Sequence, residues 1–415
     1  MALSGKLLLN NRLFWRLWTG LFISRLGDQF TIIALLWFVL QLTGSGLALA
    51  SVLLCFSLPG LFSSPILGRL LDHARLQPRI VMGLDNLFRT LAVGAIPVLF
   101  WSGLLQIWLV YLLAALAGLT APATNIGVRV VLPEMIKNNE LESANGLLSL
   151  GEQISYLAGP ALAGFLVALL GGPSVVMIDA LSFLVMTLVL FSLPDVARLS
   201  PAYPAEADGT VATLRGKLLE RFKPLFQLKE VWLVSGLSFV FFLAYGPLEP
   251  ALPLFTQDRL AVGAEGYGLL WAAFGVGALV GLLAIPFLST LSRPGVVFAA
   301  IAILWGLCLI PFLWIKNLEW AMLCLSLGGL FWAPYTTVEI SMLQRLIPAH
   351  LRGQVFGARA TLVGAAGPLG LMAGGFLLTF LEANYVIGLS ALACILAGVA
   401  GLLSPPLRRI TRVTD

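Results

Sequence analysis

Two charged residues stand inside an apolar stretch near the N-terminus. Arg25 and Asp28 lie three residues apart within residues 13–41, where most side chains are hydrophobic. If this stretch is a membrane-spanning helix, Asp28 lies about 22 Å along it, close to the middle of the bilayer, and Arg25 lies one turn away on the same face. A charge at that depth costs about 2.5–3.5 kcal/mol, so we expect both side chains to face a water-filled cavity or other charges and not lipid.

Other ionisable residues in apolar stretches are candidate companions for this pair. Asp85 and Arg89 lie one turn apart in the third apolar stretch, and Glu152 lies in the fifth. A carboxylate that becomes accessible from each side of a membrane in turn can bind and release protons, and a nearby arginine adjusts its affinity for them. We therefore expect Asp28 and Glu152 to couple transport to protons, tuned by Arg25 and Arg89. The alternative is a static charge network that braces the helices.

Five further charged residues in the apolar stretches are expected to have other roles. Asp179 lies near the outer end of its stretch and is expected to be structural. The other four lie toward the ends of their stretches, where gating or capping is expected: Arg129, Glu249, Glu339 and Arg359.

The composition is that of a membrane protein. Of 415 residues, 59% are hydrophobic and only 11% are charged, whereas a soluble globular chain is about 25% charged, so an ordinary soluble enzyme is excluded. There is no Gly-rich nucleotide loop ending in Gly-Lys-Ser/Thr and no His, Cys and carboxylate cluster with metal-site spacing, so we expect no ATP hydrolysis, no metal and no other cofactor. The net charge of +5 is spread over short loops and predicts no nucleic-acid partner.

Twelve stretches are long and apolar enough to cross a bilayer as helices, which takes roughly 20 residues each. In the connections, Lys and Arg fall almost entirely on the side of the N-terminus, and only Arg259 and Lys316 fall on the other side. Because basic residues stay on the cytoplasmic side, we predict a multi-pass protein of the cell inner membrane with both termini in the cytoplasm. The predicted spans are residues 13–41, 47–70, 79–101, 106–131, 142–169, 173–193, 230–256, 266–291, 295–315, 319–343, 353–380 and 384–404.

The longest polar stretch divides the chain in two. Residues 194–229 begin with a segment rich in Pro, Ala and Asp and continue with leucines at helical spacing between basic residues, which is typical of an amphipathic helix on the membrane surface. They separate an N-terminal bundle, 1–193, from a C-terminal bundle, 230–415. Similar short stretches recur in the halves, such as "GPALAG" from Gly159 and "GPLGLMAGG" from Gly367. We therefore predict an all-α membrane protein of two pseudo-symmetric six-helix bundles, with a solute path near the midplane between them.

Three stretches of the N-terminal half are similar to segments of a known transporter group. They are "FWRLWTGLFISRLGDQFTIIALLWFVLQLTGS" from Phe14, with its Ser-Arg-x-Gly-Asp core, "DNLFRTLAVGAIP" from Asp85, and "NNELESANGLLSL" from Asn138. Through them the chain resembles the major facilitator superfamily, and within it the drug and siderophore exporters of the macrolide-efflux and enterobactin-exporter type. The C-terminal half matches mainly in pattern. The resemblance implies the major facilitator fold and transport by alternating access.

A cytoplasmic loop motif of that superfamily is partly kept. The stretch "GRLLDHARLQPR" from Gly68 retains Gly68 and Asp72 of the usual Gly-x-x-x-Asp-Arg, with His73 in place of the arginine. Gly68, Asp72 and Arg75 are expected to form a gate in which Gly68 permits close helix approach and Asp72 accepts from a helix N-terminus. The alternative is a plain basic loop that sets topology.

A second motif resembles the antiporter signature of the superfamily. The stretch "GEQISYLAGPALAG" holds Gly151, Gly159, Pro160 and Gly164. Glycines allow another helix to approach, and the proline bends its own helix, so these residues are expected to form a flexible packing seam. In the family the pattern accompanies export. The alternative is ordinary small-residue packing.

Together these features predict a secondary active transporter and not an enzyme. The predicted task is proton-coupled efflux of an amphipathic small molecule, either a drug such as a macrolide or a siderophore. The expected partners are that substrate, protons and membrane lipid, and the expected state is a monomer. Two alternatives stay open: a lysophospholipid flippase of the same superfamily, and an importer or facilitator without coupling.

Overall fold

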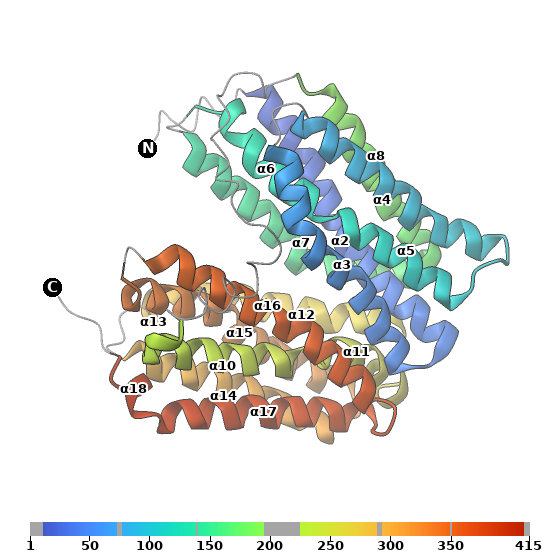
Figure 1. Ribbon diagram of the computed structural model, residues 1–415. Helices are drawn as coiled ribbons and strands as arrows, with labels where there is room; N and C mark the ends of the chain where they lie inside the picture. The colour runs from blue at the N-terminus through green and yellow to red at the C-terminus, as the bar shows by residue number, and fades with distance from the viewer. Residues whose placement is uncertain are drawn as a thin grey trace, which may run out of the picture. The chain divides into compact units, whose positions relative to one another are not determined.

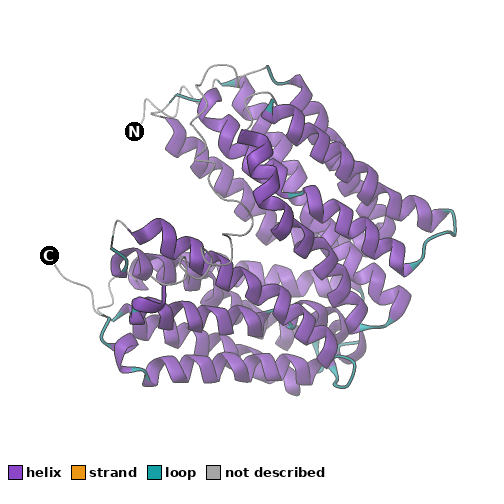
Figure 2. Ribbon diagram, viewed as in Figure 1, coloured by secondary structure: helices purple, strands orange, loops and turns teal. Residues whose placement is uncertain are grey.

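The computed structural model describes residues 11–72, 77–137, 140–194, 225–288, 293–348 and 351–410. These ranges form helices joined by short connections, with no strand among them (Figures 1 and 2). Within them, twelve helical segments are long and apolar enough to cross a membrane, and each overlaps a predicted span. Helices suit a bilayer because their backbone groups bond within the segment, where no water is available to satisfy them.

Contacts divide the chain into two compact units. The first comprises Met1–Thr43 and Ser51–Glu206, and the second comprises Gly44–Ala50 and Ala207–Asp415. Most of the predicted linker, 194–229, including its amphipathic helix, lies outside the described residues. The proposed bundle boundaries at 193 and 230 therefore stay a prediction.

The first unit holds six spans. One of them is built from two helices, α5 and α6, because the helix is interrupted where Pro122 begins α6. Proline has no N–H to continue the helical hydrogen bonds. The helices are α2 (Arg12–Thr43), α3 (Gly46–Asp72), α4 (Pro78–Trp101), α5 (Ile107–Thr120), α6 (Pro122–Met135), α7 (Leu141–Leu170) and α8 (Gly172–Ser192). The first five residues of α3, up to Ala50, are grouped with the second unit.

The second unit holds the other six spans. Its first span is broken at Gly246–Pro247 and ends in a π-helical turn. Its helices are α10 (Lys229–Tyr245), α11 (Leu248–Leu254), η3 (Phe255–Arg259), α12 (Ala264–Leu283), α13 (Ile285–Leu288), α14 (Pro294–Leu309), η4 (Ile310–Leu313), α15 (Leu318–Leu346), α16 (Arg352–Leu377), α17 (Ala383–Leu403) and α18 (Pro405–Arg408).

The same pairs of spans pack together in both units. In the first, α2 packs on α7 and α8, and α4 packs on α5 and α8; in the second, α10 packs on α16 and α17, and α14 packs on α15 and α17. Numbered within each unit, both sets pair the first span with the fifth and sixth, and the third with the fourth and sixth. The predicted pseudo-symmetry is therefore present in the packing of the helices.

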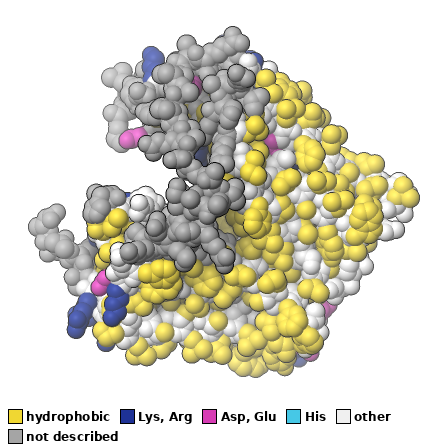
Figure 3. Space-filling view, in the orientation of Figure 1, with side chains coloured by type: hydrophobic (Ala, Val, Ile, Leu, Met, Phe, Trp, Pro, Cys, Tyr) yellow, Lys and Arg dark blue, Asp and Glu magenta, His cyan; other side chains and the backbone are white. Residues whose placement is uncertain are grey.

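Large apolar side chains cover the outer faces of the helices. Figure 3 shows hydrophobic side chains over much of the first unit. Leu91 on α4, Trp108 on α5 and Leu188 on α8 are all more than half exposed. Such extensive exposed apolar surface is abnormal in water, so these faces are suited to lipid.

The inner faces of four helices meet in a buried core. Leu17 on α2, Met82 on α4, Val131 on α6 and Met186 on α8 belong to one cluster of buried side chains. This packing fixes the relative positions of the helices that carry the charged residues of the first unit.

Candidate functional site

One arginine and three aspartates gather between α2, α4 and α8, and we call them the Arg89 cluster. Arg89 on α4 forms an ion pair with Asp28 on α2. Asp85 lies one turn earlier on α4, Asp179 lies on α8, and the Arg89 guanidinium interacts electrostatically with all three carboxylates. Asp179 and Asp85 are buried, while the Asp28 side chain keeps 22% of its surface exposed. Asp28 therefore has the most exposed side chain of the cluster.

Neutral groups hold the cluster in place. Thr124 on α6 donates to Asp85 Oδ2 at 2.6 Å, and Ser182 donates to Asp179 Oδ1 at 2.9 Å. The guanidinium of Arg89 lies over the Phe183 ring, 3.8 Å from its centroid, in a cation–π contact. The arginine is thus fixed by an aromatic face as well as by carboxylates.

A glycine on α2 makes room for one of these acids. A Cβ built on Gly27 would lie 2.2 Å from Asp179 Oδ1 and 2.4 Å from Ser182 Oγ. Any side chain at this position would push α8 away. The glycine beside Asp28 in the sequence is therefore needed for Asp179 to reach the cluster.

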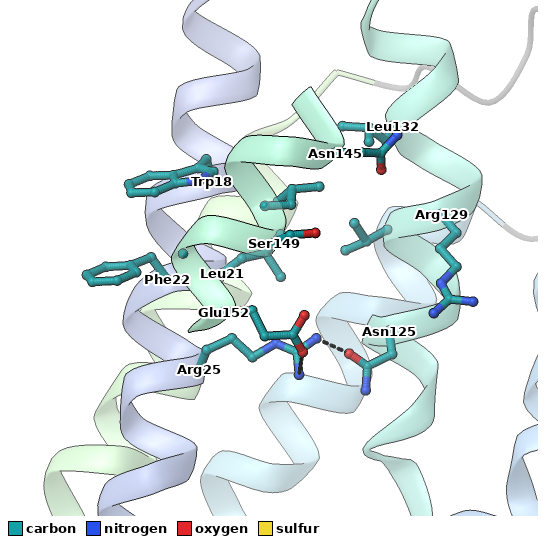
Figure 4. Close-up of a pocket in the computed structure, with 13 residues that line it drawn as sticks. Trp18, Leu21, Phe22, Arg25, Asn125, Arg129, Leu132, Asn145, Ser149 and Glu152 are labelled. Atoms are coloured by element: carbon teal, nitrogen blue, oxygen red, sulfur yellow. Dashed lines mark hydrogen bonds and ion pairs between the residues drawn. The ribbon is translucent and has the colours of Figure 1, made fainter. Parts of the chain in front are cut away.

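A second charged group lies one turn away on α2. Arg25 lies 3.5 Å from Glu152 on α7 (Nη1 to Oε1) and donates to the side-chain oxygen of Asn125 on α6. Figure 4 shows the three side chains pointing toward one another. The side chains of Arg25 and Glu152 are 33% and 61% exposed, so this pair is much wetter than the Arg89 cluster.

This second group borders a cavity within the first unit, between α2, α6 and α7. The cavity measures about 400 Å³, within the range of small-molecule sites. Its apolar wall includes Trp18 and Phe22, whose rings stack with centroids 5.3 Å apart. The lining residues are Trp18, Leu21, Phe22, Arg25, Asn125, Val128, Arg129, Leu132, Asn145, Leu148, Ser149, Gly151 and Glu152.

The structure assigns the predicted charged residues to two separate groups. Asp28, Asp85 and Arg89 come together, and so do Arg25 and Glu152. Arg25 and Asp28 do not share partners. Three residues advance a helix by 300°, so the two side chains diverge by about 60°, which is enough to reach different neighbours.

Sequence reasoning missed several members of the site. Asp179, which we expected to be structural, lies in the Arg89 cluster. Its charge within an apolar span is the feature of the sequence that could have identified it as part of the site. Arg129 was placed among span-end residues, yet it lines the cavity. Asn125 and Thr124 are ordinary polar residues in the sequence, and only the packing of α6 shows their contacts.

Among its described residues, the second unit buries one ion pair. Glu339 on α15 is fully buried and accepts from Arg359 Nε on α16 at 2.8 Å. The neighbouring aromatic side chains are closely packed, with the rings of Tyr335 and Phe241 stacked 4.0 Å apart. The two charges were expected to gate or cap helix ends, and their contact here links two helices.

The predicted gate lies at the edge of the described chain. Gly68 falls within α3, and a Cβ there would meet no described atom within 4 Å, so no close approach is seen at this glycine. The backbone of Asp72 ends α3. Its side chain and all of Arg75 lie outside the described residues.

The glycines of the antiporter-like motif face α2. A Cβ on Gly159 would lie 2.6 Å from Gln29 Cβ, and one on Gly151 would lie 3.3 Å from the Trp18 ring. Pro160 and Gly164 are buried within α7, which is continuous through them. Gly151 and Gly159 therefore lie where α7 crosses α2 closely.

Among the described residues, no group of three or more His, Cys, Asp or Glu side chains is arranged to hold a metal ion. The carboxylates of the Arg89 cluster face an arginine, which is a poor neighbour for a second cation.

Sequence comparison places the chain among transporters. The family model of the Major Facilitator Superfamily matches residues 17–371. Multidrug efflux pump Tap of Mycolicibacterium fortuitum is 29% identical over 92% of this chain and 93% of its own length. Macrolide efflux protein A of Streptococcus pyogenes is 23% identical over 86% of this chain and 87% of its own.

Comparison with solved structures points to the same fold. A bacterial homologue of the iron transporter ferroportin, in an inward-facing state, is similar with a TM-score of 0.72 and 18% identity, over 94% of this chain and 98% of that one. The nucleoside transporter NupG is similar with a TM-score of 0.73 and 15% identity, over the same shares. At these identities the likeness concerns the fold alone. Since the family match spans most of the chain and the described residues supply twelve apolar spans, the chain belongs to the Major Facilitator Superfamily and is a multi-pass membrane transporter, not an enzyme.

Proposed function

We propose that this chain is a proton-coupled exporter of amphipathic small molecules, drugs among them, that works by alternating access. The names of its relatives, a multidrug efflux pump and a macrolide efflux protein, support export of drugs. The observation that carries proton coupling is the Arg89 cluster, in which three carboxylates share one arginine.

The charge balance of the cluster supports proton binding. With all three carboxylates ionised, three negative charges face one positive charge, which leaves two negative charges uncompensated among largely buried groups. Such charges are costly in a membrane interior, and a carboxylate can relieve the cost by taking up a proton. The cluster is therefore suited to hold protons in one state of the transporter and to release them in another.

Asp28 is the proposed entry point for protons. It pairs with Arg89 while part of its side chain stays exposed, whereas Asp85 and Asp179 are buried. When Asp28 is protonated its attraction to Arg89 weakens, and Arg89 then faces the two remaining carboxylates. Proton binding at one exposed group can in this way change the contacts between α2, α4 and α8.

The cavity supports a link between protons and substrate. Glu152 pairs with Arg25 at its rim, and Arg25 lies one turn from Asp28 on the same helix. The stacked Trp18 and Phe22 rings offer an apolar surface for the body of an amphipathic guest. A guest that displaces the Glu152 contact would disturb α2 next to the Arg89 cluster.

The remaining parts of the proposal concern topology and direction. The distribution of Lys and Arg supports an inner-membrane protein with both termini in the cytoplasm. The α2–α7 crossing at Gly159 supports the assignment of an antiporter-like seam. Gly68, Asp72 and Arg75 remain the proposed gate, and a monomer is the proposed working state.

Transport in proteoliposomes tests the proposal. In vesicles whose outer face corresponds to the cytoplasm, an acid-inside pH gradient should drive uptake of rhodamine B, ethidium or a radiolabelled macrolide. Asp28→Asn should abolish gradient-driven uptake, while the control Glu319→Gln, an exposed residue at the start of α15, should not.

The opposite results are equally clear. If no pH gradient drives any of these compounds, proton-coupled efflux is wrong. If the protein moves lysophospholipid between leaflets independently of pH, it is a flippase. If uptake of a compound follows only the concentration gradient of that compound, the protein is a facilitator.

A further inference from the structure

The cavity of the first unit contains one arginine that has no partner among the described residues. Of its three charged residues, Arg25 and Glu152 pair with each other. Arg129 on α6 is exposed and has no hydrogen bond or ion pair with any residue that the structure describes. In the view of Figure 4 its guanidinium lies apart from the Arg25–Glu152 pair, beyond Asn125. The cavity therefore carries one uncompensated positive charge.

The neutral polar groups of the lining keep several hydrogen-bond donors beside the acceptor oxygens of Asn145 and Ser149. The side-chain oxygen of Asn125 already accepts from Arg25, which leaves its amide N–H groups. Asn145 uses one N–H on the Leu141 carbonyl at 2.9 Å and keeps a second. Ser149 adds a hydroxyl. A lining with a free guanidinium and spare N–H donors is complementary to an acceptor that carries negative charge.

The apolar part of the lining limits the class of ligand further. Trp18 and Phe22 form a flat stacked surface, and four aliphatic side chains complete the wall: Leu21, Val128, Leu132 and Leu148. A small inorganic anion would leave this surface unused. The cavity suits a molecule with an aromatic or aliphatic body and one acidic group.

We propose that Arg129 recognises a carboxylate on the transported molecule, so that anionic and zwitterionic amphiphiles bind the cavity in preference to purely cationic ones. The inference rests on the proposed function, since it names the substrate class of the same transporter. Arg129 is here a specificity residue of the cavity, and proton coupling belongs to other groups.

A lipid phosphate is the competing partner. Arg129 lies six residues before the end of α6, or about 9 Å along the helix, and a long arginine side chain can reach headgroups from such a depth. An uncharged detergent removes phospholipid from the protein. Preference for a soluble carboxylate under that condition separates the two partners.

Binding of a matched pair of dyes tests the inference. Rhodamine B carries a free carboxylate, and its ethyl ester has the same ring system without it. Affinities of both dyes for the purified full-length protein in dodecyl maltoside are measured by fluorescence polarisation at neutral pH. We expect wild type to prefer rhodamine B, and Arg129→Gln to weaken rhodamine B binding about tenfold while the ester changes little.

Two variants complete the design. Arg129→Lys keeps the charge and should restore part of the preference. Arg16→Gln removes an exposed arginine of α2 outside the cavity and should leave both affinities unchanged. The inference is overturned if wild type fails to bind rhodamine B or binds the ester as well, or if Arg129→Gln weakens both dyes equally. It is also overturned if the preference appears only when anionic phospholipid is added back.

The outcome is independent of proton coupling, because the dyes bind at equilibrium without a gradient. A lost preference together with intact pH-driven transport refutes only the carboxylate site. Intact preference without pH-driven transport refutes only the proposed coupling.

Discussion

The two units share a packing scheme and differ in how they hold buried charge. In the first, Arg89 interacts with three carboxylates from three helices, whereas in the described part of the second Arg359 pairs with Glu339 alone. Glu249 on α11 is half-buried and has no ion-pair partner within the described part of the chain, so it stands outside that pair. The two units thus share their helix crossings and differ in the charges that they bury.

The two arrangements differ in whether they must bind protons to become neutral. A one-to-one pair is neutral as it stands and can serve as a fixed link between α15 and α16. Three carboxylates around one arginine are neutral only after protons bind. The first unit is therefore the half in which a change of protonation can alter helix contacts, and the second unit provides a contrasting case in the same molecule.

Removal of each arginine should show the largest difference between the units. Breaking a buried ion pair costs about 3–5 kcal/mol, because the remaining charge has no partner. Arg89→Gln leaves three carboxylates uncompensated and Arg359→Gln leaves one, so Arg89→Gln should destabilise the protein more. Thermal unfolding of the purified protein, followed by tryptophan fluorescence, measures both, with Arg16→Gln as the exposed control. Equal losses would mean that Asp85 and Asp179 do not depend on Arg89.

Double variants sharpen the same comparison. Glu339→Gln combined with Arg359→Gln leaves two neutral groups and should recover most of the stability lost in the single arginine variant, about 2–3 kcal/mol. Asp28→Asn combined with Arg89→Gln should recover much less, since Asp85 and Asp179 keep their charges. The four single variants and two doubles are compared by unfolding in the same detergent. Full recovery of stability in the Asp28→Asn and Arg89→Gln double variant would mean that Asp85 and Asp179 do not interact with Arg89.

Glycines at the corresponding helix crossings should behave alike in the two units. In the pairing of first and fifth spans, a Cβ on Gly370 would lie 2.3 Å from the Leu243 carbonyl oxygen, and one on Gly159 would lie 2.6 Å from Gln29 Cβ. A carbonyl oxygen and a Cβ are both fixed to their helix and cannot move without it, so Gly370→Ala and Gly159→Ala should each cost about 1–3 kcal/mol.

Gly367→Ala provides the control for this prediction. A Cβ at Gly367 would meet nothing within 4 Å, so this substitution should be neutral or slightly stabilising, as alanine favours a helix. If Gly370→Ala is as harmless as Gly367→Ala, the crossing of α16 and α10 is looser than described. Unfolding temperatures of the three variants decide it.

The spans could be predicted from the sequence because burial in lipid demands long apolar runs, and these are local. All twelve were located, and the repeat of the halves was visible in short similar stretches. The exact equivalence was less visible. The sequence likeness pairs Gly159 with Gly367, whereas the tight crossing of the second unit uses Gly370, three residues later. Packing contacts depend on helix rotation, which a short alignment does not specify.

The site was predictable only in part, for a related reason. Charges inside apolar spans are conspicuous, which is why Asp28, Arg89 and Glu152 stood out. Their partners depend on which helices pack together, and α8 brings Asp179 to the cluster only because Gly27 leaves space. Neutral partners such as Asn125 carry no signal at all in a single sequence.

The smallest effect on stability should come from the exposed pair at the cavity. Glu152 and Arg25 are 3.5 Å apart, and their side chains are 61% and 33% exposed, so water screens their attraction. Exposed pairs contribute about 0–1 kcal/mol, and Glu152→Gln should therefore change the unfolding temperature little.

The same variant should nevertheless alter transport if Glu152 links the cavity to protons. Uptake driven by an acid-inside gradient should fall in Glu152→Gln, while exchange of substrate across vesicles without a gradient persists, because the neutral amide still fills the same space but cannot release a proton. Glu142→Gln, on the same helix α7 and outside the cavity lining, is the matched control. Unchanged gradient-driven uptake would leave the Arg89 cluster as the sole proposed proton site. A large loss of stability would instead place Glu152 with Glu339, as a brace between helices, and would remove the contrast between a wet pair and a buried one.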